Sequence, residues 1–148
     1  MSIAALMADH HSQCDELFAD TEAACFSGNW PKCGEYLVAL TEGVESHFKA
    51  EEEILFPAFE SASGMTSGPT EMMRVEHGQM RELFAEMGTA AAQQDEALFR
   101  GNAETLLILM QQHNMKEENI LYPMCERTLA GDALVEQLQA RINQTCLS

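Results

Sequence analysis

The chain is poor in basic residues and lacks any long apolar run. It has 8 Lys and Arg against 24 Asp and Glu in 148 residues, which gives a formal net charge of −16. Binding to nucleic acids and to anionic membranes depends on clustered Lys and Arg, so neither is an expected partner. A membrane-spanning helix needs about eighteen consecutive apolar residues, and no segment reaches that length. We therefore predict a protein that binds neither nucleic acid nor membranes.

Cysteine is also scarce, and several catalytic motifs are missing. The five cysteines are odd in number and form no Cys-x-x-Cys pair, which favours reduced thiols in a cytoplasm over a disulfide framework. The N-terminus has no basic stretch and turns polar at Asp9, unlike a secretory signal peptide. Neither a glycine-rich phosphate loop nor a nucleophile paired with a base is visible. These features predict a cytoplasmic location and argue against hydrolysis.

What the chain does contain is a helical pattern. Its length and its 46% hydrophobic content predict one globular domain over residues 1–148. Apolar residues recur three and four positions apart between sparse breaks at Gly and Pro, and no strand-like alternation is evident. Short connections between long helices favour antiparallel neighbours. The sequence therefore predicts an all-α, up-down-up-down four-helix bundle over about residues 3–128.

Two further features refine this fold. Pro57 and Pro123 are expected to end or kink the second and fourth helices. A short C-terminal helix is predicted over about residues 132–146, with Leu138 and Ile142 on its apolar face. We expect this helix to pack against the bundle, and a dimer contact through it is the alternative.

The sequence repeats itself at an offset of 66 residues. The segment 11–19 matches 77–85 at six of nine positions, and 47–57 matches 113–123 at six of eleven. The repeating unit is a helical hairpin, so the bundle is expected to consist of two such hairpins. Two copies that pack face to face have an approximate two-fold axis. A side chain that points inward in one copy therefore has a counterpart that points inward in the other.

Four of the five histidines fall into register through this repeat. His47 and Glu51 are four residues apart, and so are His113 and Glu117, so each pair shares one helix face. His11 and His77 come from the preceding helices. Four imidazoles and two carboxylates exceed the needs of one tetrahedral zinc ion and suit two first-row metals, with the carboxylates favouring iron or manganese.

An incidental surface origin is the alternative explanation of these residues. It requires Glu51 and Glu117 to be ordinary charges although apolar residues flank them, among them Ile54 and Ile120. Burying a carboxylate is costly unless it is paired or bound to metal, which favours the metal site. A ferritin-type centre is a second alternative, but its Glu-x-x-His motif has the opposite order and a spacing of three.

With these motifs, the sequence resembles the bacterial hemerythrin-like HHE cation-binding domains over about residues 3–128. The resemblance is carried by the segments 9–18, 47–57, 74–77 and 113–123. It implies a non-haem di-iron centre with a bridging oxygen species, in which zinc or manganese are possible substitutes. It also implies a role for each of six residues: terminal ligands at His11, His47, His77 and His113, and bridging carboxylates at Glu51 and Glu117.

The sequence departs from the oxygen-carrying hemerythrins at Met73. Those proteins have a fifth histidine one turn before the third-helix ligand, and the repeat places Met7 at the matching position before His11. A thioether is a poor ligand for hard iron, so both methionines are expected to be wall residues. The missing ligand leaves an additional open coordination position. Such access favours redox turnover or metal exchange over simple oxygen carriage.

The neighbours of the six residues are harder to assign. His10 pairs with Glu76 in the repeat, and we expect it either to face solvent or to hydrogen bond to a ligand. Glu52 and Glu118 are either acceptors for imidazole N–H groups or plain surface charges. A packing role is expected for Cys14. Tyr122 is the counterpart of Phe56, which also favours packing.

Three functions follow from these observations. The first is a di-iron protein whose partner is a small diatomic molecule or peroxide, with oxygen, nitric oxide and peroxide as the candidates. Its role is then binding, sensing, or stress response and repair. The second is an iron-binding storage or sensing module without catalysis. The third is a metal-free interaction bundle, which requires the His and Glu sets to be incidental.

Overall fold

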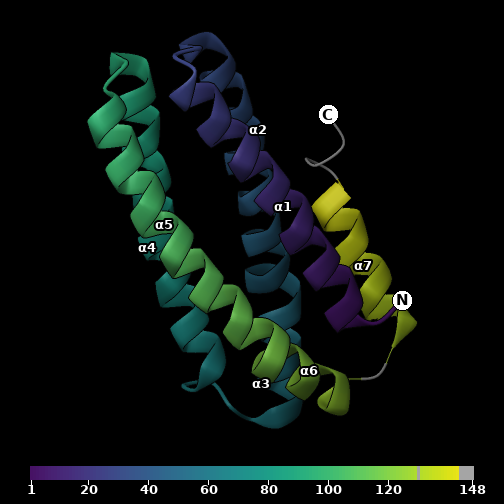
Figure 1. Cartoon of the computed structure of the whole chain (residues 1–148). Coiled ribbons are helices and arrows are strands. Elements are labelled where there is room, and N and C mark those ends of the chain that lie inside the picture. The colour runs from purple at the N-terminus through teal and green to yellow at the C-terminus, as the bar shows by residue number, and fades with distance from the viewer. Residues whose placement is uncertain (130, 144–148) are drawn as a thin grey trace.

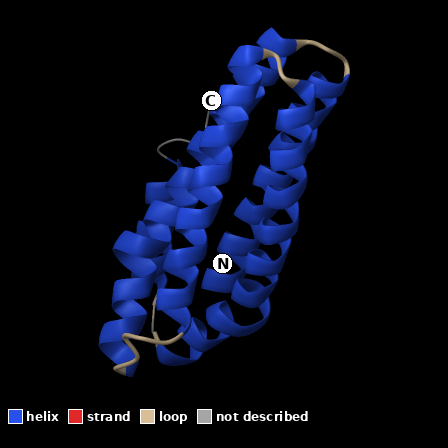
Figure 2. Cartoon of the chain, turned by 90° about the vertical axis from the view of Figure 1, so that its left-hand side faces the viewer, coloured by secondary structure: helices blue, strands red, loops and turns tan. Residues whose placement is uncertain are grey.

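The computed structural model describes residues 1–129 and 131–143, and nearly all of them are helical. Four long helices run up-down-up-down (Figure 1): α1 (Ile3–Phe26), α2 (Trp30–Ala50), α4 (Pro69–Gln93) and α5 (Glu96–Lys116). Helix α1 packs along α2 and α4 along α5, and the two hairpins meet where α2 contacts α4 and α1 contacts α5. The described residues contain no strand (Figure 2). The predicted all-α bundle of two hairpins is confirmed.

The hairpin turns follow from capping chemistry. Asn29 caps α2 by accepting a hydrogen bond from the Lys32 backbone N–H, and Asp95 caps α5 in the same way from the Leu98 N–H. Gly28 adopts a φ of 76° in the first turn, a left-handed conformation that glycine reaches without steric cost. These short turns keep the two helices of each hairpin antiparallel.

A π-helical turn precedes each of the two prolines within the second and fourth helices. These turns are η1 (Glu51–Leu55) and η2 (Glu117–Leu121), and the chain continues as α3 (Phe56–Ser63) and α6 (Tyr122–Thr128). Proline has no N–H to donate to the carbonyl four residues earlier. The Phe56 and Tyr122 N–H groups bond instead to the carbonyls of Glu51 and Glu117, five residues back. Neither helix therefore ends at its proline.

The C-terminal helix α7 (Asp132–Asn143) packs against α2, α1 and η1 (Figure 1). Leu138 and Ile142 are buried in this contact. The expected packing against the bundle is thus observed. The last predicted residues of this helix, 144–146, lie outside the described part of the chain.

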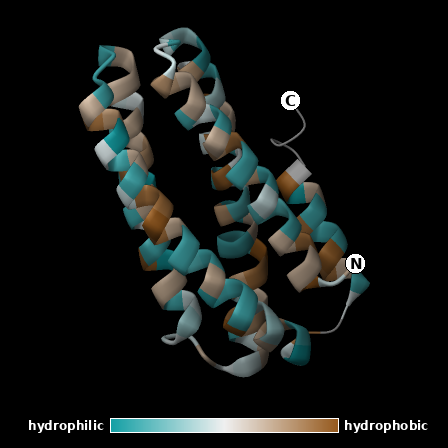
Figure 3. Cartoon of the chain, viewed as in Figure 1, coloured by the Kyte–Doolittle hydropathy of each residue, from teal (hydrophilic) through white to brown (hydrophobic). Residues whose placement is uncertain are grey.

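Two apolar clusters fill the bundle, one on each side of a polar layer. The cluster near the hairpin turns includes Phe18, Leu40, Phe84 and Leu106, and the other includes Leu55, Phe59 and Leu138. The helices carry hydrophobic and hydrophilic residues interspersed along their length (Figure 3). Within the described residues, every helix is too short or too polar to cross a membrane. The polar layer between the clusters contains the predicted metal site.

Candidate metal centre

The structure brings all six predicted site residues together in the bundle core. Each long helix contributes one imidazole, and each π-helical turn begins with one carboxylate. All six are buried, and Glu51, Glu117 and His77 have no exposed surface at all. The groups that could hold a cation are Glu51, His77, His113 and Glu117 on one side, and His11, His47 and Glu117 on the other. In each group the donor atoms lie within 4.8 Å of one another.

Each carboxylate spans the two sides of this centre. Glu51 directs Oε1 toward His77 Nε2 at 3.0 Å and Oε2 toward His47 Nε2 at 3.6 Å. Glu117 directs Oε1 toward His11 Nε2 at 3.2 Å and Oε2 toward His113 Nε2 at 3.3 Å. We call the Nε2 atoms of His11 and His47, with the carboxylate oxygens that face them, the first half-site. The second half-site comprises the Nε2 atoms of His77 and His113 with their facing oxygens.

The second half-site contains four buried polar atoms that form no hydrogen bond within the described chain, although each carboxylate oxygen lies at ion-pair distance from an imidazole nitrogen. They are Glu51 Oε1, His77 Nε2, His113 Nε2 and Glu117 Oε2. Buried polar atoms are nearly always satisfied, and each unpaired one costs free energy. Four such atoms that converge from four elements fit a cation, which accepts lone pairs from nitrogen and oxygen alike. The donor set of this half-site is therefore suited to a metal ion.

The outward nitrogens of three imidazoles bond to carboxylates. Nδ1 of His11 lies 2.7 Å from Glu118, Nδ1 of His77 lies 2.7 Å from Glu52, and Nδ1 of His113 lies 2.8 Å from Glu76. An Nδ1–H donated to a carboxylate leaves the Nε2 lone pair aimed at the centre of the bundle and makes it a better donor to metal. Glu52 and Glu118 are thus imidazole partners rather than plain surface charges.

His47 differs, because its outward partner is another histidine. Its Nδ1 lies 2.8 Å from Nδ1 of His10, which is buried with 2% of its surface exposed. Burial, together with the neighbouring His47 and His11, lowers the pKa of His10 to about 3, so its ring is neutral. The tautomer of His47 that leaves its Nε2 lone pair for the centre carries the proton on Nδ1, and the neutral His10 can accept that Nδ1–H through its own Nδ1 lone pair. His10 therefore hydrogen bonds to a predicted ligand, and the solvent-facing alternative was wrong.

Cationic side chains hold two of the outward carboxylates in place. Arg81 bonds to Glu52 at 3.0 Å and to Glu45 at 2.8 Å, and Lys116 pairs with Glu76. Burial alone would raise the pKa of Glu52, but hydrogen bonds from His77 and Arg81 lower it to about 2. Glu52 is therefore ionised at neutral pH, and it accepts a hydrogen bond from the Nδ1–H of His77.

Tyr122 enters the first half-site, which the comparison with Phe56 did not predict. Its hydroxyl lies 2.7 Å from Glu51 Oε2 and 2.9 Å from Glu117 Oε1. It also lies 3.2 Å from His47 Nε2 and 3.4 Å from His11 Nε2. Burial and the two carboxylates raise the pKa of Tyr122 well above its usual value, so the phenol keeps its proton while no cation is present.

The π-helical turn explains why the sequence did not reveal this position. Tyr122 follows Glu117 by five residues, and in an α-helix side chains at this spacing point in different directions. In a π-helical turn, residues five apart lie one above the other. The same change moves Ile120 off the apolar face, and its side chain is 55% exposed. The signal in the sequence that could have indicated this turn was a proline shortly after the predicted carboxylate ligand.

Apolar residues close the centre from both sides. Met7 and Met73 are buried in the cluster that also contains Leu55, as expected of wall residues. Phe48 stacks on the His77 ring at 3.9 Å between centroids. Cys14 packs in the opposite cluster, with its sulfur 4.0 Å from His10 Nδ1. A cavity of about 20 Å³ adjoins His11 and His47, which is room for one water-sized molecule.

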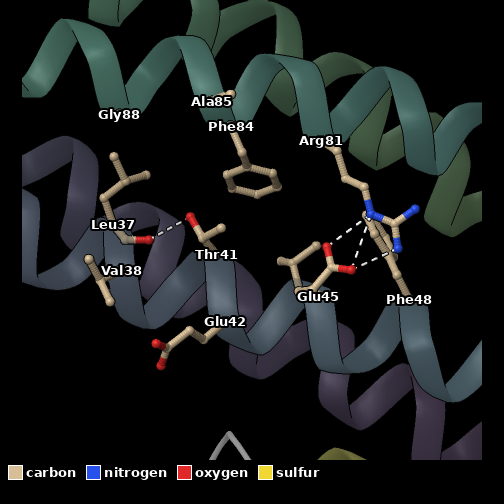
Figure 4. A pocket seen from close by; sticks show the side chains of 11 residues that line it. Leu37, Val38, Thr41, Glu42, Glu45, Phe48, Arg81, Phe84, Ala85 and Gly88 are labelled. Carbon is tan, nitrogen blue, oxygen red and sulfur yellow. Dashed lines mark hydrogen bonds and ion pairs between the residues drawn. The ribbon is translucent and has the colours of Figure 1, made fainter.

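A larger groove of about 600 Å³ runs along the surface between α2 and α4 (Figure 4). Its walls are mostly apolar and include Leu37 and Phe84, and its lining also includes Phe48, Arg81 and Glu45. Phe48 is the residue that stacks on His77, and Arg81 is the residue that holds Glu52. One part of the groove is therefore separated from the second half-site by a single layer of side chains.

The fold and this donor set define a class of protein: an antiparallel helical bundle that binds cations through histidine and carboxylate in its core. The chain belongs to the hemerythrin HHE cation-binding domain family, whose model matches residues 2–125. It is similar to the iron-sulfur cluster repair protein YtfE of Salmonella schwarzengrund, Salmonella newport and Salmonella agona. Each is 33% identical over 108 residues, covering 66% of this chain and 47% of the relative.

The match to these relatives is partial in length. The chain spans about half the length of the curated relatives it matches. No solved structure matches the chain. The comparisons therefore establish the family of this chain, and they do not extend to the whole length of its relatives.

Proposed function

We propose that this chain holds two iron ions in its core, one at each half-site. His11 and His47 bind the first ion, His77 and His113 bind the second, and Glu51 and Glu117 bridge the two. The observation that carries this proposal is the set of four buried donor atoms without hydrogen bonds at the second half-site. The two carboxylates also present one oxygen to each half-site, which is the geometry a bridging ligand needs.

The donor chemistry favours iron over zinc. Each half-site offers two imidazoles and one oxygen from each carboxylate, which would close a tetrahedral zinc site but leaves open positions on an ion of higher coordination number, such as iron. Imidazole and carboxylate together suit iron or manganese, and no cysteine reaches the donor atoms among the described residues. Zinc and manganese are the competitors that metal analysis has to distinguish.

We further propose that the centre interacts with oxygen, nitric oxide or peroxide in a stress or repair role. An iron pair supplies electrons and open coordination positions to such molecules. The cavity of about 20 Å³ beside His11 and His47 admits only a small molecule. The relatives are named for iron-sulfur cluster repair, which supports this role over oxygen transport. Met73 in place of a fifth histidine points the same way.

Iron storage or sensing without catalysis is the second candidate. The net charge of −16 favours it, because an acidic surface raises the local concentration of cations. A storage module exchanges its iron readily with a chelator and reacts weakly with oxygen, nitric oxide and peroxide. A redox centre retains its iron and changes its visible spectrum with at least one of them.

Metal quantification and visible spectroscopy on protein produced with added iron test both candidates. We expect about two iron ions per chain, and a spectrum that changes with oxygen, peroxide or nitric oxide. Glu51→Gln is expected to lose iron, because it removes a ligand of both ions. Glu53→Gln is the matched control, since Glu53 lies in the same turn but pairs only at the surface with Lys49 and Arg141. Equal iron in both variants would contradict the proposed centre.

A further inference from the structure

The two half-sites differ in one oxygen atom. The repeat makes Phe56 and Tyr122 equivalent, and both side chains are completely buried next to the centre. Only Tyr122 has a hydroxyl, and that hydroxyl faces all four donor atoms of the first half-site. The four donor atoms of the second half-site have no equivalent partner. The hydroxyl therefore occupies a position that the second half-site leaves open.

The distances around this hydroxyl match those within one coordination shell. Ligand atoms about 2.1 Å from a metal, and at right angles to each other, lie about 3 Å apart. The Tyr122 oxygen lies 2.7, 2.9, 3.2 and 3.4 Å from the other donors of the first half-site. The phenol has a single proton and can donate it to only some of these atoms at a time, whereas one ion enclosed by the five atoms would bind them all.

We propose that Tyr122 is a fifth protein ligand of the ion at the first half-site, bound through its phenolate oxygen. This inference rests on the proposed two-metal centre. Tyr122 would hold the ion with an oxygen lone pair in exchange for its phenol proton, so that one proton would leave the protein for each ion bound there. The first ion then has five protein ligands and the second has four. The second ion then has one protein ligand fewer than the first, because Phe56 presents only an apolar ring there.

The hydrogen-bond partners of the imidazoles also differ between the two half-sites. At the second half-site, both imidazoles donate to carboxylates, Glu52 and Glu76. At the first, only His11 does so, because the partner of His47 is the imidazole of His10 instead of a carboxylate. Tyr122 would thus add an anionic oxygen to the half-site in which one imidazole has no carboxylate partner. A ferric ion, which is hard and highly charged, favours such an oxygen ligand.

Visible absorption and resonance Raman spectra of the iron-loaded protein test this assignment. A phenolate bound to ferric iron gives a charge-transfer band, and excitation in that band enhances the vibrations of the tyrosine ring. The chain has two tyrosines, so Tyr36→Phe is a matched control for Tyr122→Phe. We expect the ring vibrations in the unmodified protein and in Tyr36→Phe, and their complete loss in Tyr122→Phe. Iron content and helical circular dichroism are measured on the same samples.

The possible outcomes separate this inference from the proposed function. Protein that takes up no iron refutes both. Protein with two ferric ions per chain and no ring vibrations refutes only the role of Tyr122, as does persistence of the vibrations in Tyr122→Phe. Vibrations in the unmodified protein that disappear only in Tyr122→Phe support it, whether or not that variant keeps its first ion. Phe56→Tyr in the Tyr122→Phe background is expected to restore a phenolate band, now from the second half-site.

Discussion

The two half-sites come from one repeat, yet their surroundings differ in a coordinated way. His113 at the second half-site donates to Glu76, which pairs with Lys116. At the first, the equivalents of Glu76 and Lys116 are His10 and Ala50, both buried. Where the imidazole donates to a carboxylate, a lysine pairs with that carboxylate. Where its partner is the neutral His10, the position of the lysine is occupied by an alanine. Because an unpaired buried charge is costly, the two substitutions belong together.

Tyr122 in place of Phe56 is the third difference, and it changes the centre itself. The two ions are expected to share the same bridging carboxylates but to differ in charge and in openness. A repeat can therefore keep its six donors and still produce two chemically distinct positions. The following experiments test this distinction, beginning with the change of largest expected effect.

Removal of a shared carboxylate should affect both half-sites, whereas removal of one imidazole should affect only one. We expect Glu117→Gln to bind less than one iron ion per chain, because both ions lose a ligand. His113→Ala is expected to keep the first ion and to lose the second. Metal quantification after gel filtration measures both, with the exposed Glu104→Gln as control. Equal iron loss in Glu117→Gln and His113→Ala would show that the half-sites fill only together.

The pH dependence of stability should have opposite signs with and without metal. In the metal-free centre, burial lowers the pKa of His113, but the carboxylates of Glu117, Glu51 and Glu76 outweigh it and raise that pKa to about 9. His113 therefore stabilises the metal-free fold fully below its unfolded pKa of 6.5, and this contribution is lost as the pH rises through about 9.

Metal binding requires the neutral imidazole, so the iron affinity should rise over the same interval and fall toward acidic pH. Thermal unfolding of metal-free and iron-loaded protein measures both trends. The range from pH 6 to pH 9 spans roughly the pKa values of His113 in the unfolded and in the folded chain. Parallel curves for the two forms would argue against His113 as a ligand.

Loss of the arginine behind the second half-site should have a moderate effect. Arg81→Ala frees Glu52, which then orients His77 less firmly, and we expect about 10- to 100-fold weaker binding of the second ion. A chelator titration measures this affinity. Arg100→Ala is the control, because Arg100 pairs only with Glu96 on an exposed helix face and packs near Phe26. An equal effect of both substitutions would mean that Arg81 acts through general charge alone.

The smallest effect is expected at His10. His10→Leu leaves the His47 Nδ1–H without its acceptor and should weaken binding of the first ion by about 10-fold. His10→Gln retains an acceptor of similar reach and should come closer to the unmodified protein. The same chelator titration distinguishes the two variants. A weakening confined to the second ion would show that His10 acts elsewhere.

The sequence was sufficient for the fold and for the composition of the centre. Helical periodicity and the short breaks at Gly and Pro predict the bundle, because each depends on residues close in the chain. The repeat brought His11, His47, His77 and His113 into register, because two equivalent hairpins must point equivalent residues inward. Tertiary structure then placed the six side chains in one buried layer.

The sequence by itself thus determined which donors the core contains, and only the tertiary structure decided how they differ. The positions of Tyr122 and Ile120 depend on a π-helical turn, which breaks the period used to read the sequence. The neutral state of His10 depends on the burial and contacts that α1 and α2 create together. Periodicity is a local property of one helix, whereas the environment of a side chain is set by the helices that pack around it.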